Sequence, residues 1–196
     1  MNSSPPSITQ PKGRTGDWIA TVSGRRWFIT DPHPDDVDIQ DIAHGLSLIC
    51  RFGGHCRQFY SVAQHSVLIA NEMCRRECPA EMVLWGLLHD APESYLGDMV
   101  RPLKQSMQNY KVLEHVTEGC ILVGLGIDAP THGTRVLVKQ LDDVLLMTER
   151  RDLMNHCGYE WTPRAEPLSG KIIPWNPETA KTNFLETYLA LRKLLA

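Results

Sequence analysis

A short stretch in the middle of the chain ends in a cluster of ionisable side chains. Residues 84–98 begin as an apolar helical run and continue as His-Asp-Ala-Pro-Glu. A helix that continued this far would direct His89, Asp90 and Glu93 to one place. Pro92 permits this only by starting or kinking a turn, because it lacks a backbone donor. An imidazole and two carboxylates are costly to bury without a partner. A divalent metal ion is the simplest partner.

Two further helices each place one ionisable side chain on an apolar face. His65 falls among the inward positions of a helix that Ser61 opens with a Ser-x-x-Gln capping box. Asp142 interrupts the apolar stripe of a later helix. Its neighbour Asp143 is displaced by about 100° around the helix axis, and the two exchange roles if the register differs. Two imidazoles and two carboxylates suit a borderline ion such as Mn, Co, Fe, Ni or Zn.

The residues around these four candidate ligands suit phosphate chemistry. A bound divalent ion lowers the pKa of a water molecule and polarises a phosphoryl oxygen. Glu93 would then move protons, and Arg101 or Lys104 would neutralise phosphate charge. On spacing alone, a solvated loop explains these three residues equally well. A single His-Asp pair is also common in protein cores, so the metal hypothesis depends on all three helices converging.

The N-terminal part of the chain predicts a tail, a hairpin and one helix. Residues 1–16 are rich in Ser, Pro, Gly and Thr, which is typical of a mobile tail. Strand-like residues 18–22 and 27–30 flank Ser-Gly-Arg-Arg and predict a β-hairpin. The acidic connector 31–36 lacks the glycine and terminal glutamate of an EF-hand, so calcium is not expected. Residues 38–50 carry apolar side chains at helical spacing.

The rest of the chain predicts helices separated by loops. Helices are expected to begin at Ser61 and Pro79 and to span residues 108–123, 134–155 and 178–195. Residues 96–104 are expected to form a loop, and the proline-rich residues 159–177 an irregular excursion. The prediction is an all-α bundle of about six helices with a small N-terminal β-hairpin, forming one domain over residues 17–196.

The composition excludes several classes of protein. The 196 residues are 42% hydrophobic and 22% charged, with a net charge of −3, so a protein that coats nucleic acid is not expected. The longest apolar run, residues 119–127, is too short to span a membrane, and no signal peptide is visible. The six cysteines form no CxxC pair, and free thiols explain the i, i+4 pair Cys74 and Cys78 better than a metal does. A cytoplasmic location is expected, or the host cytoplasm if the gene is carried by a phage. A metalloprotease is excluded because no HExxH occurs.

The order His65, His89-Asp90 and Asp142 resembles the H…HD…D signature of the HD-domain metal-dependent phosphohydrolases. The resemblance is closest to the group of bacterial 5′-deoxynucleotidases and phage deoxynucleoside triphosphate hydrolases. It extends over about residues 51–152 and includes the segments 60–66 (YSVAQHS), 91–98 (APESYLGD) and 101–104 (RPLK). The combined spacing of these segments is specific, whereas an HD pair alone is not.

The resemblance implies an all-α domain, one catalytic divalent ion and hydrolysis of a deoxynucleotide phosphate. It implies a monophosphatase or a triphosphohydrolase, for which dATP is one candidate substrate. It assigns Glu93 as the catalytic acid or base and Asp98 as a residue that supports a ligand or the sugar. It also implies a homo-oligomer, at least a dimer, with no nucleic-acid polymer or membrane as partner.

The pair Arg51-Phe52 resembles the Arg-aromatic pair that meets the phosphate and the nucleotide in the deoxynucleotidases. Arg101 and Lys104 are the other expected substrate-binding residues. The chain departs from the minimal deoxynucleotidase by the hairpin and helix before Arg51. The spacing between Arg51 and His65 also differs by about one residue, so a place in the core explains Phe52 nearly as well as contact with a base.

Two other functions remain open at this point. A dinuclear HD phosphodiesterase or oxygenase would need further histidines between Asp90 and Asp142, where only His115 and His132 occur, the latter in an expected loop. A non-catalytic binding module would be expected to have lost at least one of the four candidate ligands, yet all are present.

Overall fold

A computed structural model describes residues 13–14, 16–162 and 164–196. The tail expected over residues 1–16 therefore lies mostly outside the described residues. The described chain is helical except for a two-stranded antiparallel sheet at its N-terminal end, which confirms the predicted fold class. None of the described helices has the length and apolar character that a membrane crossing requires.

A buried tryptophan packs the N-terminal hairpin against the helices. Strands β1 (Trp18–Ala20) and β2 (Arg26–Phe28) pair with Ile19 opposite Trp27. Trp27 is fully buried, and its ring stacks on the Tyr95 ring with the centroids 3.8 Å apart. This contact joins the hairpin to the short helix α4 (Glu93–Leu96), which begins with a candidate catalytic residue.

The longer helices correspond to those that the apolar spacing predicts, except that the helix expected to carry His89 and Asp90 ends at Leu88. The longer helices are α1 (Ile39–Leu48), α2 (Val62–Arg75), α3 (Ala80–Leu88), α6 (Gln108–Leu125), α7 (His132–Leu153) and α8 (Pro177–Leu194). The short segments are the 3-10 turns η1 (Pro34–Asp36) and η2 (Arg51–Gly54), and the helices α4 and α5 (Arg101–Ser106). The described residues between 159 and 176, which leave out residue 163, contain no helix or strand, as predicted.

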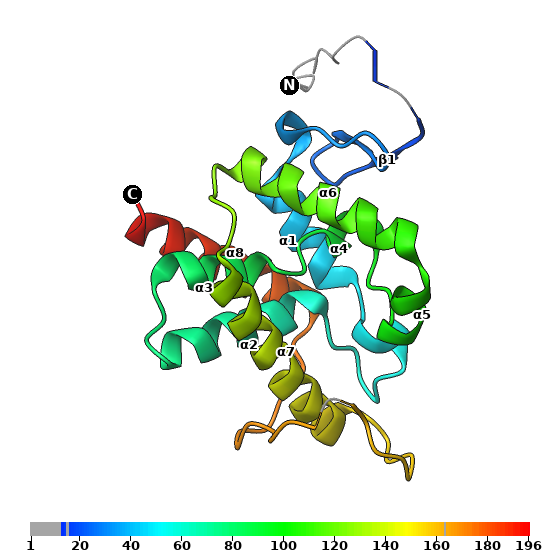
Figure 1. The fold of residues 1–196 in the computed structure, drawn as a ribbon, viewed down its shortest axis with the longest axis vertical. Helices are drawn as coiled ribbons and strands as arrows, with labels where there is room; N and C mark the ends of the chain where they lie inside the picture. The colour runs from blue at the N-terminus through cyan, green and yellow to red at the C-terminus, as the bar shows by residue number, and fades with distance from the viewer. Residues whose placement is uncertain (1–12, 15, 163) are drawn as a thin grey trace, which may run out of the picture.

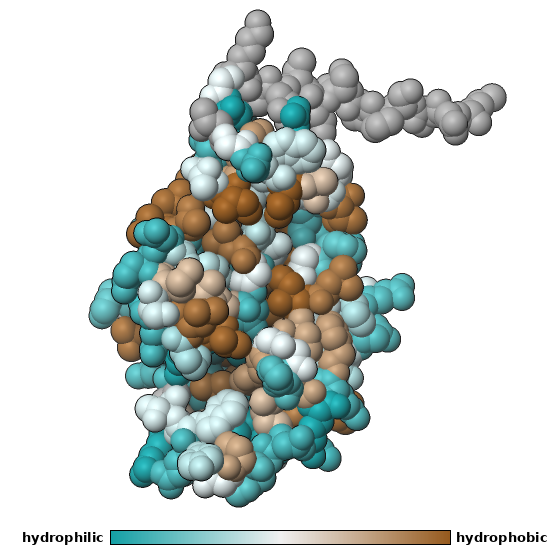
Figure 2. Space-filling view, turned by 90° about the vertical axis from the view of Figure 1, so that its right-hand side faces the viewer, coloured by the Kyte–Doolittle hydropathy of each residue, from teal (hydrophilic) through white to brown (hydrophobic). Residues whose placement is uncertain are grey.

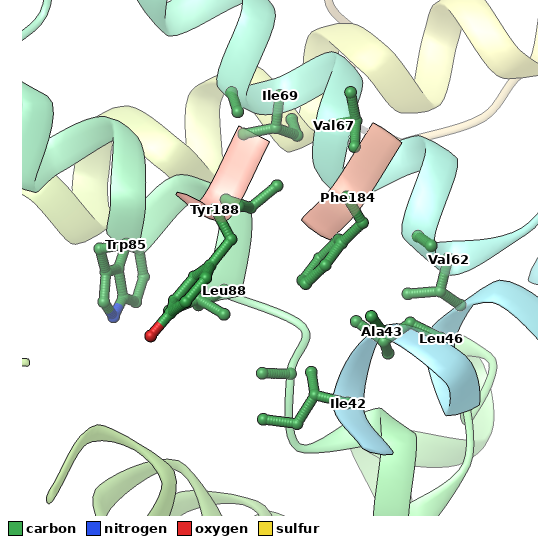
Figure 3. Close-up of a cluster of buried hydrophobic side chains, with 14 of the residues drawn as sticks. Ile42, Ala43, Leu46, Val62, Val67, Ile69, Trp85, Leu88, Phe184 and Tyr188 are labelled. Atoms are coloured by element: carbon green, nitrogen blue, oxygen red, sulfur yellow. The ribbon is translucent and has the colours of Figure 1, made fainter. Parts of the chain in front are cut away.

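The core forms where α8 packs against α1, α2 and α3 (Figure 1). Figure 3 shows Phe184 and Tyr188 of α8 directed into a cluster of aliphatic side chains from these three helices. Phe184 is completely buried, as are Ile42 and Leu46 of α1. Burying side chains of this size contributes about 1.5–3 kcal/mol each. The C-terminal helix therefore holds together the elements that carry three of the candidate ligands.

Two local expectations are wrong. The second half of the loop expected at residues 96–104 forms α5, because Pro102 fits the first turn of a helix and the Lys104 amide donates to the Val100 carbonyl. His132, expected in a loop, is the first residue of α7, because the side chain of Thr131 caps this helix by accepting from the Thr134 amide.

The surface around α5 mixes apolar and polar side chains. Figure 2 shows the right-hand side of Figure 1, where α5 lies, with hydrophobic patches between hydrophilic ones. The apolar residues Val100, Leu103 and Met107 are all exposed here.

Two glycines of α6 provide a matched test of how this helix packs. A Cβ at Gly124 would lie 2.5 Å from the carbonyl oxygen of Pro34 and 2.7 Å from the Val37 Cβ, whereas a Cβ at Gly119 would meet nothing within 4 Å. Gly124→Ala should therefore lower the free energy of unfolding by about 1–3 kcal/mol through overpacking. Gly119→Ala should raise it by up to about 1 kcal/mol, because alanine favours a helix. Urea unfolding measures both, and equal effects of the two substitutions would contradict this packing.

Candidate metal centre

Four side chains from three separate parts of the chain meet at one point. His65 comes from α2, His89 and Asp90 from the turn that follows α3, and Asp142 from α7. The Nε2 atom of His65 lies 3.5 Å from the Asp142 Oδ1 and 3.7 Å from the Asp90 Oδ2. The Nε2 atom of His89 lies 3.2 Å from the same Asp90 oxygen. Ligand atoms of His65, His89 and Asp142 all lie within 4.8 Å of one another, so this group could hold a metal ion.

Both histidines present a free nitrogen to this point. The Nδ1 atom of His89 lies 2.7 Å from the carbonyl oxygen of Gly86, and the Nδ1 atom of His65 lies 2.7 Å from a carboxylate oxygen of Glu149. Because a carbonyl oxygen only accepts, His89 carries its proton on Nδ1, and the Glu149 carboxylate favours the same tautomer of His65. Each Nε2 is buried and has no hydrogen-bond partner among the described residues. A buried polar atom without a partner is unusual in a folded protein, and a cation would satisfy both.

The charges at this point favour a positive ion. Burial raises the pKa of Asp90 and of Asp142, but His89 outweighs this effect at Asp90, and His65 and Arg51 outweigh it at Asp142, so both pKa values fall below the usual range. The two carboxylates are therefore ionised. Burial lowers the pKa of His89, but the charge of Asp90 overcomes it and raises that pKa above its ordinary value.

Glu149 supports His65 and is the functional residue that the sequence reasoning missed. It is completely buried on α7, where it also accepts from the Tyr60 hydroxyl at 2.9 Å and from the Arg51 Nη2 at 3.1 Å. Burial raises the pKa of Glu149, but Arg51 and His65 outweigh that effect and lower it, so the carboxylate stays ionised. Glu149 lies seven residues after Asp142, about two helical turns, and this spacing was a signal that both face the same side.

Arg51 and Phe52 occupy the turn η2. The buried Arg51 guanidinium lies between Glu149 and Asp90, with its Nη1 atom 3.6 Å from the Asp90 Oδ2. Phe52 has a left-handed backbone with φ of 58°, which is unusual for a residue other than glycine and costs about 1–3 kcal/mol. Its ring is half-buried rather than in the core, 5.9 Å between centroids from Trp161 in the irregular excursion.

Glu93 and Asp98 lie next to the cluster, and the pKa of each carboxyl group is raised. Glu93 is buried at the start of α4, and its Oε2 atom has no partner among the described residues. Burial, followed by the charges of Asp90 and Asp98, raises the pKa of Glu93 well above its usual range, and burial also raises the pKa of Asp98. The Lys104 Nζ lies 3.9 Å from the Glu93 Oε1. Burial lowers the pKa of Lys104, but the charges of Glu114 and Glu93 raise it overall.

The structure separates the two adjacent aspartates of α7. Asp142 directs one carboxylate oxygen at His65, whereas Asp143 pairs with the Arg101 Nη2 at 3.1 Å and also with Lys139. Asp142 is thus the member of the cluster. Its second oxygen lies 3.0 Å from the Lys139 Nζ and 3.8 Å from Arg101.

The remaining candidate ligands are outside this cluster, although His115 lines the same cavity as His89, Asp90 and Asp142. In the part of the chain that the structure describes, His65, His89 and Asp142 form the one group of three or more such side chains close enough for an ion. All six cysteines are free thiols. His115 and His132 are exposed on α6 and at the start of α7.

Replacing Glu149 tests its hold on His65. Glu149→Gln keeps an oxygen acceptor but removes the charge that fixes the His65 tautomer, so the affinity for Mn²⁺ or Co²⁺ should fall about 10–100-fold. Calorimetric titration measures this affinity, and far-ultraviolet circular dichroism checks that the helices remain. Glu186→Gln, at an exposed position on α8, is the control. If the Glu149→Gln protein folds and its metal affinity is unchanged, Glu149 does not support the metal centre.

Comparison with known proteins finds relatives over most of the chain. No family model matches the sequence. The chain is 39% identical over 118 residues to the uncharacterized protein RCAP_rcc00048 of Rhodobacter capsulatus, across 57% of this chain and 60% of that protein. It is 38% identical over 182 residues to the uncharacterized protein YfdR of Escherichia coli K12, across 90% of this chain and 97% of that protein. At this identity over nearly the whole of both chains, the protein belongs to the family of YfdR.

Proposed function

We propose that this protein is a hydrolase of deoxynucleotide phosphates that uses one divalent transition-metal ion, like the HD-domain phosphohydrolases that its sequence resembles. The observation that carries the proposal is the pair of buried, unpartnered Nε2 atoms of His65 and His89 facing the carboxylates of Asp90 and Asp142. This set of nitrogen and oxygen donors fits Mn, Co, Fe, Ni or Zn. When bound there, such an ion supplies positive charge that polarises a phosphoryl oxygen.

Glu93 is the residue best suited to move a proton at this site. Because burial and two neighbouring carboxylates raise its pKa, its carboxyl group holds a proton under conditions in which an exposed glutamate has lost it. A protonated carboxyl can donate to the leaving oxygen of a phosphate ester, and its conjugate base can accept a proton from water. The partnerless Oε2 atom leaves one oxygen of Glu93 free for this exchange.

Three cations near the cluster would neutralise the charge of a bound phosphate. The Arg51 guanidinium lies 3.6 Å from Asp90, Arg101 lies 3.8 Å from Asp142, and Lys104 lies 3.9 Å from Glu93. Each cation therefore lies next to a carboxylate that would bind the metal or to Glu93, which would transfer the proton. Positioned charges of this kind stabilise the charge that develops during phosphoryl transfer.

The other functions considered lack such support. A dinuclear enzyme needs a second set of ligands, and the described residues provide one group only. A non-catalytic module has no need for two histidines that each hold a free nitrogen against an ionised carboxylate. The homo-oligomer implied by the resemblance stays a prediction.

Removing one ligand tests the whole proposal. Asp90→Asn should abolish binding of Mn²⁺ or Co²⁺ and release of phosphate, diphosphate or triphosphate from a panel of deoxynucleotides, while leaving the helix content unchanged. Asp143→Asn is a matched control, because the adjacent carboxylate faces Arg101 instead and metal binding should persist. Full turnover by Asp90→Asn would show that the ligand assignment is wrong. If the wild-type protein releases nothing from any nucleotide, the proposed activity is wrong.

Glu93→Gln separates proton transfer from metal binding. The amide is nearly the same size but cannot exchange a proton, so the metal should stay bound while turnover slows by about 10²–10⁴-fold. Steady-state assays with the metal content measured in parallel report both properties. Glu81→Gln, at an exposed position on α3, should behave as the wild type. If Glu93→Gln turns over at the wild-type rate, Glu93 takes no part in proton transfer.

A further inference from the structure

A cavity of about 370 Å³ opens beside the metal centre, between α6 and α7. Its volume lies in the range of small-molecule binding sites. His89, Asp90 and Asp142 line one part of it, so a molecule held there would also reach the centre. The remaining lining carries the cations Lys104, Lys111, Arg135 and Lys139.

Positive charge exceeds negative charge in the lining outside the ligands. The four cations face two carboxylates, of which Glu114 pairs with Lys104, and Glu118 pairs with Arg135 at 2.6 Å. Lys139 pairs with the aspartates of α7. Lys111 donates to the carbonyl oxygen of Gln105 at 3.3 Å and forms no ion pair with any described residue. The lining thus keeps an ammonium group without a counter-charge.

The chemistry on the Phe52 side of the centre is different. Arg51, Phe52 and Trp161 are not among the described residues that line the cavity. The Phe52 and Trp161 rings contact each other, and the Arg51 guanidinium lies 5.4 Å from the Phe52 ring centroid. Aromatic rings suit a nucleobase, because every base has a face that can stack. The metal centre therefore has an aromatic surface near Arg51 and a cationic cavity toward α6.

We propose that this cavity binds the phosphate chain of a deoxynucleoside triphosphate, with Lys111 and Arg135 contacting the phosphates beyond the one at the metal centre. This inference rests on the proposed function and names triphosphates, rather than monophosphates, as the substrates. A monophosphate bound at the metal centre has no further phosphate to place among these cations. A triphosphate carries two further phosphates, whose oxygens accept from a guanidinium in pairs and from an ammonium as a point charge.

The test compares dATP with dAMP in the wild type and three variants. The wild type should have a KM for dATP at least about tenfold below its KM for dAMP. Lys111→Gln and Arg135→Gln should each raise the KM for dATP about tenfold and change the KM for dAMP much less, because a charged hydrogen bond to phosphate is lost. Lys171→Gln, exposed in the irregular excursion, should change neither value.

Direct binding separates this inference from the proposed function. Calorimetry on the Glu93→Gln protein, at a fixed concentration of free Mn²⁺, should give tighter binding of dATP than of dAMP, and Lys111→Gln should remove most of the difference. Such a difference without hydrolysis by the wild type would keep the cavity assignment and overturn the activity. Hydrolysis of both nucleotides with equal KM values, unaffected by Lys111→Gln, would overturn the cavity assignment alone.

Arg135 also lies over the Trp85 ring, with its Cζ atom 5.1 Å from the ring centroid, so its replacement can disturb packing. Lys111→Gln avoids this difficulty, because the ammonium group of Lys111 bonds to a carbonyl oxygen and stacks on no ring of a described residue. If Lys111→Gln folds as the wild type and leaves the preference for dATP intact, the inference is wrong whatever Arg135→Gln does.

Discussion

The candidate metal centre depends on the bond between Glu149 and His65. Both side chains are fully buried, and an isolated carboxylate in such a place would cost several kcal/mol. Glu149 avoids this cost by accepting from His65, Tyr60 and Arg51 at once. The bond joins residues 84 positions apart and fixes α7 against α2 at the level of the cluster. The bond also favours the neutral His65 tautomer that carries its proton on Nδ1. The Nε2 atom, which faces Asp90 and Asp142, is then unprotonated and has a free lone pair.

Two short segments between helices complete the centre. In η2, left-handed residues Phe52 and Gly53 reverse the chain directly after Arg51, so that the guanidinium points inward between Glu149 and Asp90. At the end of α3, the turn through His89 and Asp90 separates this helix from α4. Pro92 starts the next turn, as its missing donor requires. The ion pairs of Arg51 offset the strain at Phe52, because a different turn would withdraw the guanidinium from both Glu149 and Asp90.

Much of this arrangement could be predicted from the period of the apolar residues. The period identified the longer helices and placed His65 and Asp142 on inward faces, because one buried face repeats every 3.6 residues. It did not single out Glu149, since a glutamate late in a helix usually faces solvent, and only tertiary partners reveal otherwise. It also left Asp142 and Asp143 undecided, because adjacent positions differ only in what the rest of the fold places beside them. Trp161 had no periodic signal, because irregular segments have none.

The charges around the cluster explain why metal and phosphate binding should be coupled. Arg51 pairs with Asp90 as well as with Glu149, and Arg101 and Lys139 pair with Asp142 as well as with Asp143. As long as these carboxylates need the cations for neutralisation, an arriving phosphate competes with them for the same donors. If the carboxylates were neutralised as metal ligands, they would compete less for the neighbouring cations, which would then be more available to a phosphate. On the proposed function, the carboxylates that would hold the cation would therefore also decide when the surrounding arginines and lysine can hold an anion, and the two binding events would reinforce each other.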